Sequence, residues 1–360
     1  MAVYLILLGL LLITAILELL HIRIVKEQHQ AIYLGLIIAL VLVAGLRYGL
    51  EEDYWHYYHV FNGTEKVSSL ELGFKLFNSV IHVFFKNYGV YCFIVAIISM
   101  GIKGKYFGKL KYPFVALLCY YLRFYVLFEL NAIRQGIAMA FVIVAIYYLL
   151  NNDKGKYCLF TVIALSFHSS AVCVLLVPFI KKVKLKLKLK HILFIYCGCL
   201  IFRLVFFNDV IASFAPYISG VLGSTNNLIH GLQYIINSGD KMQEMNYFSL
   251  ARVIIPGICL YFITNKANQV YYDLYFTGSV LNLLFWGLDT IAFRIPAVFY
   301  IFEVYILNDA LVEQKLFGKR KKDWIFTACL FCVAFCDIWT FASYLIDSRT
   351  LIPYRTVLGI

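Results

Sequence analysis

The sequence predicts an all-α protein that crosses a membrane many times, with about ten transmembrane helices. Hydrophobic residues make up 62% of the 360 residues and charged residues only 14%, and the mean hydropathy is +0.80. Soluble domains usually carry about 25% charged residues. The apolar residues form continuous blocks rather than the alternating pattern of a membrane β-barrel. We therefore expect a single integral membrane domain over residues 1–360.

Ten apolar blocks are candidates for the spans, since one helical crossing requires roughly 20 apolar residues. No basic segment precedes the first block, so we expect no cleavable signal peptide. The blocks cover residues 2–20, 30–46, 88–102, 112–128, 132–150, 192–207, 247–265, 270–287, 290–308 and 324–345.

Lysines predict which connections lie in the cytoplasm, because short cytoplasmic loops carry an excess of Lys and Arg. They cluster in four connections: Lys103 to Lys111, Lys154 and Lys156, Lys181 to Lys190, and Lys315 to Lys322. The two long connections, residues 48–72 and 208–246, are richer in Asp and Glu than in Lys. We expect these two loops and both chain ends to be extracytoplasmic.

The apolar run at residues 157–180 is predicted to be a re-entrant helical hairpin. It has Lys at both ends and the polar sequence ALSFHSSAVC in its middle, so both ends are expected on the cytoplasmic side. Ser169 or Ser170 is the expected cap of the second half-helix, because an interrupted helix leaves backbone donors that need a side-chain oxygen. The alternative is a single crossing with a serine-rich middle.

Residues 72–86 are predicted to form an amphipathic helix at the outer membrane surface. Polar residues recur at spacings of three and four, which places them on one helical face. They are Lys75, Asn78, Ser79, His82 and Lys86.

The ten cysteines predict no chemistry. All lie within apolar segments, and the long polar loops contain none. The pair Cys197 and Cys199 and the spacing of Cys329, Cys332 and Cys336 could suggest metal ligands, but cysteines in spans are usually small apolar fillers. We expect no metal and no cofactor.

The arginines are distributed differently from the lysines, and they predict the functional site. Six lie at or within the outer halves of six different predicted helices, where positive charge is normally avoided. An intramembrane Arg usually faces a partner or a water-filled cavity, although snorkelling explains isolated cases. Guanidinium groups bind phosphate through paired hydrogen bonds. We expect a shared outward cavity for a diphosphate-bearing lipid, lined by Arg47, Arg123, Arg134, Arg203, Arg252 and Arg294.

The adjoining segment RYGLEEDYWHYYHVF, residues 47–61, is typical of carbohydrate recognition. Aromatic rings stack on sugar faces, and carboxylates accept hydrogen bonds from sugar hydroxyls. An interfacial aromatic belt is the alternative for Trp55 and the tyrosines. Asp53, His56 and His59 could share a helical face as metal ligands, but we favour a site without metal.

Five motifs, taken in order, resemble the EpsG-type Wzy family of bacterial polysaccharide repeat-unit polymerases. The ordered set runs from about residue 30 to residue 310, and Glu51 with Glu52 departs from the more neutral pair expected there. The motifs are RYGLEEDYWHYY at 47–58, LELGF at 70–74, NAIRQGIAMAF at 131–141, ALSFHSSAV at 164–172 and AFRIPAVFY at 292–300.

The resemblance implies that oligosaccharide units carried on undecaprenyl diphosphate are joined into exopolysaccharide, capsule or O-antigen at the outer face of the bacterial cytoplasmic membrane. It draws attention to Arg47, Asp53, Tyr54, Glu71, Arg134, His168 and Arg294. Arg123, Arg203 and Arg252 rest on their placement alone.

The required chemistry predicts a role for each group. Arg134 and Arg294 would grip the departing diphosphate with help from Arg47, because fixed cations stabilise the charge that develops there. Asp53, Glu71 or His168 would be the base, although a buried His at a helix break more often satisfies neighbouring backbone. The loop at 53–58, including Tyr54 and Tyr57, would hold the acceptor sugar.

Two other functions fit a cationic membrane cavity. A flippase for the same lipid-linked sugar would be expected to show related halves, and the sequence has no internal repeat. An integral-membrane sugar acyltransferase with His168 as base would open toward the cytoplasm. The partners expected are the lipid-linked oligosaccharide as donor and acceptor, membrane lipid, and proteins that regulate chain length or flip the carrier. The net charge of +12 fits an anionic inner leaflet and requires no nucleic acid.

Overall fold

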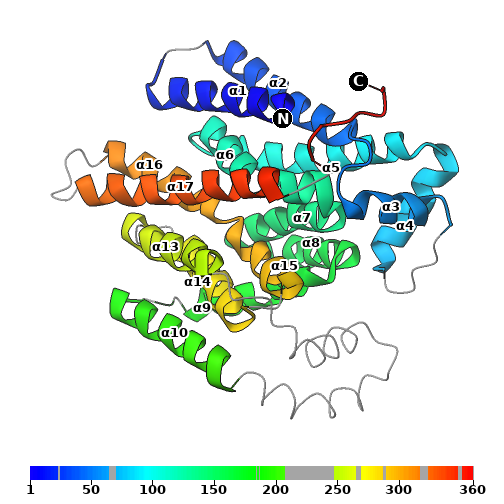
Figure 1. Ribbon diagram of the computed structural model, residues 1–360. Helices are drawn as coiled ribbons and strands as arrows, with labels where there is room; N and C mark the ends of the chain where they lie inside the picture. The colour runs from blue at the N-terminus through cyan, green and yellow to red at the C-terminus, as the bar shows by residue number, and fades with distance from the viewer. Residues whose placement is uncertain are drawn as a thin grey trace. The chain divides into compact units, whose positions relative to one another are not determined.

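The structure is a computed structural model whose described residues fall into two compact units (Figure 1). The first unit comprises residues 1–178, 304–321 and 334–360, and the second comprises residues 179–303 and 322–333. The predicted outer loop at 208–246 lies outside the described residues. The structure describes residues 1–22, 25–64, 70–183, 185, 187–206, 247–264, 269–286, 289–316, 323–347 and 351–359.

The first unit contains most of the long helices. In chain order they are α1 (Ala2–Leu19), α2 (Lys26–Gly45), α3 (Glu52–Phe61), α4 (Leu72–Phe84), α5 (Tyr88–Phe107), α6 (Pro113–Tyr120), η1 (Tyr121–Asn131), α7 (Ile133–Leu150), α8 (Lys154–Phe167), η2 (Ser169–Leu176) and α16 (Glu303–Leu316). Its last helix, α17 (Asp323–Asp347), begins in the second unit and ends in the first.

The second unit consists of shorter helices. They are α9 (Val177–Val183), which starts at the boundary, α10 (Leu189–Ile201), η3 (Phe202–Phe206), α13 (Tyr247–Ile263), α14 (Gln269–Leu284) and α15 (Asp289–Tyr300).

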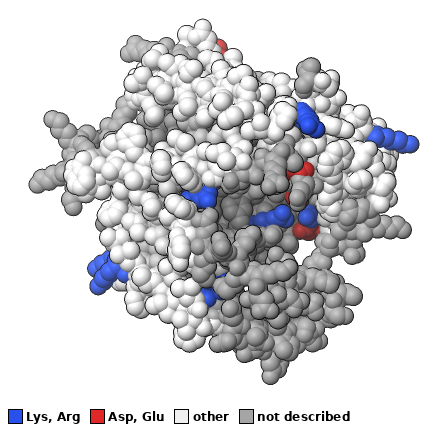
Figure 2. All heavy atoms as spheres, in the orientation of Figure 1, with Lys and Arg blue, Asp and Glu red and all other residues white. Residues whose placement is uncertain are grey.

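The predicted class, an all-α polytopic membrane protein, is confirmed. Eight helical segments of the described chain are long and apolar enough to cross a membrane, and no β-strand occurs among the described residues. Two other predicted blocks form the shorter helices α13 and α14. Large apolar side chains such as Ile6, Phe194 and Phe331 are exposed, as expected of surfaces that contact lipid. Most of the described surface in Figure 2 is white, because its residues are neither acidic nor basic.

Close helix packing in the first unit depends on small residues. A Cβ added to Gly45 of α2 would lie 2.5 Å from Phe93 Cδ2 of α5, and one added to Gly104 of α5 would lie 2.5 Å from Ile37 Cδ1 of α2. Small residues let membrane helices approach closely. Helix α7 is buried along most of its length, so it forms the centre of this unit.

A helical hairpin is present at 157–180, and its re-entrant position in the membrane stays a prediction. Helix α8 ends at Phe167, His168 has extended backbone, and the 3-10 helix η2 follows. The Tyr157 hydroxyl near the start of α8 donates to the Val174 carbonyl of η2 at 2.9 Å. Ten residues of α-helix span about 15 Å, so this contact requires the chain to turn back after Phe167. The alternative of a single straight crossing is therefore wrong.

The predicted cap of the second half-helix is wrong. His168, rather than Ser169 or Ser170, is the N-cap, and its Nδ1 accepts a hydrogen bond from the Ser170 backbone N–H at 3.2 Å. The Ser169 N–H donates to a carboxylate from another helix, Glu71, at 2.9 Å. The free backbone donors of η2 are thus satisfied by a ring nitrogen and by a distant side chain.

The predicted amphipathic helix is α4, which covers Leu72–Phe84. It exposes an apolar stripe that includes Leu72, Leu76, Val80 and Val83, while Asn78 is buried. The helix thus presents apolar residues on its exposed side, and one residue of the predicted polar face, Asn78, is turned into the protein. The interfacial position of α4 stays a prediction.

Two predicted boundaries differ from the structure. The block at 290–308 is two helices, α15 and α16, separated by a turn at 301–302, and the chain passes between the two units there. The block at 112–128 continues to Asn131 as η1, a π-helix of 11 residues. The single membrane domain over 1–360 stays a prediction.

Lys103 was assigned to a cytoplasmic connection by its neighbours, and this is wrong. It lies inside α5 and is fully buried. A long helical side chain extends back toward the helix N-terminus, and here its ammonium group meets Glu129 of η1 at 2.5 Å. The positive-inside rule cannot distinguish such a lysine from a solvated one.

Candidate active site

Arg134 is at the centre of a cluster of polar side chains in the first unit. Its Nη1 donates to Glu71 Oε2 at 2.6 Å, and its Nε donates to the Tyr57 hydroxyl at 3.3 Å. The Tyr57 hydroxyl donates to Asp53 Oδ2 at 3.4 Å. We call these four residues the Arg134 cluster. Four of the residues predicted from sequence therefore form one chain of hydrogen bonds.

The four members come from three segments whose local structure aims them at one point. Asp53 and Tyr57 are one turn apart on α3, so they share a helical face. Glu71 is the N-cap residue of α4. Arg134 is the second residue of α7, immediately after the π-helix η1 ends. The cluster thus forms where three helices begin.

Glu71 holds two parts of the fold together. Its Oε2 binds Arg134, and its Oε1 accepts the Ser169 N–H of the hairpin. The adjoining glycine shows how close α4 and α8 are, because a Cβ on Gly73 would lie 2.2 Å from Ser166 Oγ. Both carboxylate oxygens of Glu71 are therefore engaged within the protein.

The Arg134 guanidinium lies between aromatic rings and is partly open. Its Cζ is 5.6 Å from the ring centroids of both Tyr57 and Phe74, which are buried. This distance permits cation–π attraction. The side chains of Arg134 and Glu71 retain 14% and 17% exposure. An anionic ligand could therefore reach the guanidinium from one side.

Arg47 is buried near this cluster. It is 1% exposed, its Nη1 donates to the Ala44 carbonyl, and its Nε has no hydrogen-bond partner among the described residues. Both Arg47 and Arg134 act electrostatically on the buried Tyr91. Burial alone would lower the pKa of Arg47, but the pKa is raised overall. Arg47 remains a cation.

The C-terminal segment fixes the backbone at Arg47. Residues Arg47 and Thr356 form an isolated antiparallel bridge, the Tyr48 N–H donates to the Arg355 carbonyl at 2.9 Å, and the Val357 N–H donates to the Leu46 carbonyl at 2.9 Å. The segment that leads into α3 is therefore held in place by residues more than 300 positions later in the chain.

Aromatic residues of the 47–61 segment form a connected group with an exposed side. The Trp55 ring centroid lies 5.7 Å from that of Tyr48, 5.3 Å from that of Tyr54 and 5.7 Å from that of Tyr58. Trp55 and Tyr48 are more than 40% exposed. Burial raises the pKa of Tyr54, so its phenol stays protonated. The rings pack edge to face around Trp55, and the exposed Trp55 ring can stack on a sugar ring.

His168 adjoins Ser169, which the cluster binds, and it is the N-cap residue of η2. It is 7% exposed, and its Nδ1 contacts the Ser170 N–H and Ser170 Oγ. The following residue, Ser169, is bound by Glu71 of the cluster. The contacts of His168 Nδ1 are those of a helix cap, and its role as a base stays a prediction.

Arg123 has an acidic partner away from the Arg134 cluster. Its Nη1 lies 3.2 Å from Asp337 Oδ1 of α17, and the two side chains are 11% and 3% exposed. The sequence analysis did not identify Asp337, although a carboxylate inside an apolar block predicts a buried partner. This pair joins η1 to the C-terminal half of α17 within the first unit.

We expect that replacing Arg123 with Met will destabilise the protein, because it removes the guanidinium that pairs with the buried carboxylate of Asp337. Loss of one partner of a buried pair costs about 3–5 kcal/mol. The double variant Arg123→Met, Asp337→Leu should recover most of this loss. Thermal unfolding in detergent measures both. If the double variant is as stable as the parent but inactive, Arg123 binds substrate as the sequence predicts.

The other three predicted arginines belong to the second unit. Arg203 of η3 is 2% exposed, and its Nε donates to the Trp286 carbonyl at 2.5 Å. Arg252 of α13 and Arg294 of α15 are half-buried. The convergence of all six arginines on one cavity stays a prediction.

Comparison with known proteins bears on the identity of this site. The model of the EpsG family matches residues 30–356. The chain belongs to the EpsG family. No curated protein and no solved structure matches it. Membership supports a polymerase-like role in exopolysaccharide synthesis for this multi-pass membrane protein, as the sequence motifs indicate.

All four members of the Arg134 cluster lie within the EpsG match and within or beside its motifs. Asp53 and Tyr57 belong to the first motif, Glu71 to the second and Arg134 to the third. Residues 77 and 63 positions apart in the sequence are thus joined by the hydrogen bonds of a single site.

The alternative prediction of a metal site on α3 gains no support from the arrangement of the described side chains. His59 Nδ1 lies 3.0 Å from Thr64 Oγ1. In the described part of the chain, no group of three or more His, Cys, Asp or Glu side chains is arranged to hold a metal ion.

Proposed function

We propose that this EpsG-family protein joins oligosaccharide units carried on a polyprenyl diphosphate into a longer glycan at the outer face of the bacterial cytoplasmic membrane. The observation that carries the proposal is the Arg134 cluster. It combines a partly exposed guanidinium, a carboxylate and an aromatic surface in one unit. These are the groups needed for a diphosphate, an acceptor hydroxyl and a sugar ring.

The reaction breaks one bond and forms one. The bond between the anomeric carbon of the growing glycan and its diphosphate oxygen breaks, and the diphosphate leaves with the electron pair. The hydroxyl oxygen of an incoming unit bonds to that carbon and loses its proton to a base. The products are the lengthened glycan on the acceptor lipid and a free polyprenyl diphosphate.

Arg134 is the proposed electrophilic group. Negative charge grows on the diphosphate as the bond breaks, and a fixed guanidinium stabilises that charge more than it stabilises the ground state. Without a bound ligand, Nη1 of Arg134 donates a hydrogen bond to Glu71 Oε2 at 2.6 Å. A diphosphate with two negative groups competes with this single carboxylate. Arg294 and Arg47 stay predicted contributors to the same grip.

Asp53 is the proposed base. Both oxygens of Glu71 already accept hydrogen bonds from the protein, and Nδ1 of His168 caps η2. Asp53 is half-buried and accepts a 3.4 Å contact from Tyr57. Asp53 is linked to Arg134 through the Tyr57 hydroxyl. A partly exposed carboxylate in this position can take the proton of the acceptor hydroxyl. Trp55 and its aromatic neighbours would hold the acceptor sugar.

The experiment that tests this proposal is glycan analysis of a strain lacking the protein. Loss of a polymerase leaves single repeat units on the cell surface. Loss of a flippase traps them inside, and loss of an acyltransferase leaves long glycan that lacks an acyl group. We expect surface glycan of one unit and restoration of long chains by the wild-type protein. Long glycan in the deletion strain contradicts the proposal.

A further inference from the structure

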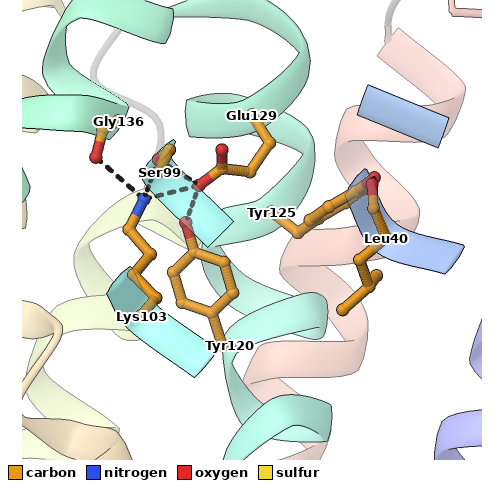
Figure 3. A network of polar contacts seen from close by, with 7 residues as sticks. All are labelled: Leu40, Ser99, Lys103, Tyr120, Tyr125, Glu129 and Gly136. Carbon is orange, nitrogen blue, oxygen red and sulfur yellow. Dashed lines mark hydrogen bonds and ion pairs between the residues drawn. The ribbon is translucent and has the colours of Figure 1, made fainter. Parts of the chain in front are cut away.

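A second polar cluster lies inside the helices of the first unit, and the reaction proposed above does not use it. The Lys103 ammonium of α5 lies 2.5 Å from Glu129 Oε1 of η1, 2.7 Å from Ser99 Oγ and 2.8 Å from the Gly136 carbonyl of α7 (Figure 3). We call Lys103, Glu129, Ser99 and Tyr120 the Lys103 network.

The network is enclosed and its charges are matched. Ser99, Lys103, Tyr120 and Glu129 are each at most 2% exposed. Glu129 Oε1 also accepts from the Tyr120 hydroxyl at 2.6 Å and from Ser99 Oγ at 3.1 Å. Lys103 uses three hydrogen bonds, which is the full number that an ammonium can donate. A buried ion pair with all donors used is specific in geometry.

The network holds both sides of the segment that presents Arg134. Glu129 is four residues before the start of α7, and Gly136 is two residues after Arg134. The Lys103 ammonium thus binds the side chain of Glu129, which precedes Arg134 in the chain, and the backbone carbonyl of Gly136, which follows it. Rotation of the first turn of α7 would break one of these two hydrogen bonds.

The backbone at this junction is unusual and tightly packed. Segment η1 is a π-helix of 11 residues. Such helices are rare in proteins, and those that occur often lie at functional sites. A Cβ added to Gly136 would lie 2.3 Å from the Phe128 carbonyl oxygen, so the start of α7 touches the end of η1 directly. The Tyr125 hydroxyl of η1 donates to the Leu40 carbonyl of α2 at 2.6 Å (Figure 3).

We propose that Lys103 and Glu129 are positioning residues of the polymerase: their buried ion pair sets the junction of η1 and α7 and thereby aims Arg134 at the diphosphate. Neither residue touches substrate. An apolar pair of similar size could fill the same space, because buried ion pairs are often replaceable without loss of stability. The hydrogen bond to Gly136 is the feature that such a pair lacks. This inference rests on the proposed function.

The decisive variant is the double substitution Lys103→Met, Glu129→Gln, which removes both charges and nearly preserves volume. We expect an unfolding temperature close to that of the parent, a similar KM for the lipid-linked oligosaccharide and a kcat lower by about 100-fold, since an error of about 1 Å in a catalytic group has that effect. Lys105→Met is the matched control, because Lys105 is exposed on the same helix.

A second readout reports on Arg134 without catalysis. Phenylglyoxal modifies accessible arginines, and peptide mass spectrometry gives the rate for each. We expect the modification rate at Arg134 to rise at least about tenfold in the double variant, which corresponds to a loss of roughly 1.4 kcal/mol of protection. The modification rate at Arg123 should stay unchanged. This result stands even if the wild-type protein makes no polymer, so the failure of either proposal can be recognised.

The inference is overturned if the double variant has parental kcat and parental modification of Arg134. If that variant does not fold, Glu129→Gln decides the question, because it removes the ion pair but keeps a side-chain oxygen that can accept from Tyr120 and Ser99. A lower kcat with faster modification of Arg134 then supports positioning. Parental values of both in Glu129→Gln reject it.

Discussion

Replacing Arg134 with Ala is expected to abolish long glycan and to leave single-unit products. Arg134 is the partly exposed guanidinium of the cluster and binds Glu71 at 2.6 Å. Removal of one preorganised donor to a developing oxyanion lowers kcat by about 10²–10³-fold. The measurement is the length distribution of surface glycan in a deletion strain that carries the variant, together with kcat on lipid-linked oligosaccharide in detergent.

The substitution Arg134→Lys separates charge from geometry. Lysine keeps the positive charge but not the planar pair of donors, so we expect a product of reduced length. Arg355→Ala is the matched control, because Arg355 is exposed and alanine keeps the backbone carbonyl that accepts from the Tyr48 N–H. Glycan of parental length from a well-expressed Arg134→Ala protein would contradict the assignment of Arg134 as the diphosphate-binding group.

The helices were predictable because membrane insertion imposes one simple requirement on each span. A helix in hydrocarbon satisfies its own backbone hydrogen bonds, so a continuous apolar block suffices to identify it. The hairpin at 157–180 was predictable for a related reason, since Lys at both ends and a polar centre indicate a break. The π-helix η1 was not, because its wider turn leaves no signal in hydropathy.

The Arg134 cluster was predictable in its members but not in its connections. Asp53, Tyr57, Glu71 and Arg134 were identified from motifs and from charge in outer helical halves. Spacing within one helix can pair Asp53 with Tyr57, but it cannot show that Glu71 caps the hairpin as well as binding Arg134. That connection depends on the close approach of α4 to α8 at Gly73.

The Lys103 network was missed because two rules that are sound on average failed at one residue. Lys103 lies near other lysines, so the positive-inside rule assigned it to the cytoplasm, and Glu129 lies just beyond an apolar block. A Lys and a Glu at the ends of adjacent spans can meet inside the membrane when their side chains extend toward each other. A glutamate directly at the end of an apolar block is the signal that would have indicated a buried partner.

Gly136→Ala is expected to disrupt the junction that both polar clusters share. The new methyl group would lie 2.3 Å from the Phe128 carbonyl oxygen, and that oxygen belongs to backbone that cannot rotate away. Overpacking of this kind costs roughly 1–3 kcal/mol, and the start of α7 must shift to relieve it. Glycan length should fall sharply, and the unfolding temperature in detergent should decrease.

The matched control is Gly101→Ala on helix α5, where an added Cβ meets nothing within 4 Å. Alanine favours a helix over glycine by about 0.5–1 kcal/mol, so this variant should be at least as stable as the parent and fully active. The two changes are chemically identical and differ only in the space around the methyl group. If both variants retain parental stability and glycan length, the contact between Gly136 and Phe128 does not constrain Arg134. If only Gly136→Ala fails, the position of the first turn of α7 sets the activity.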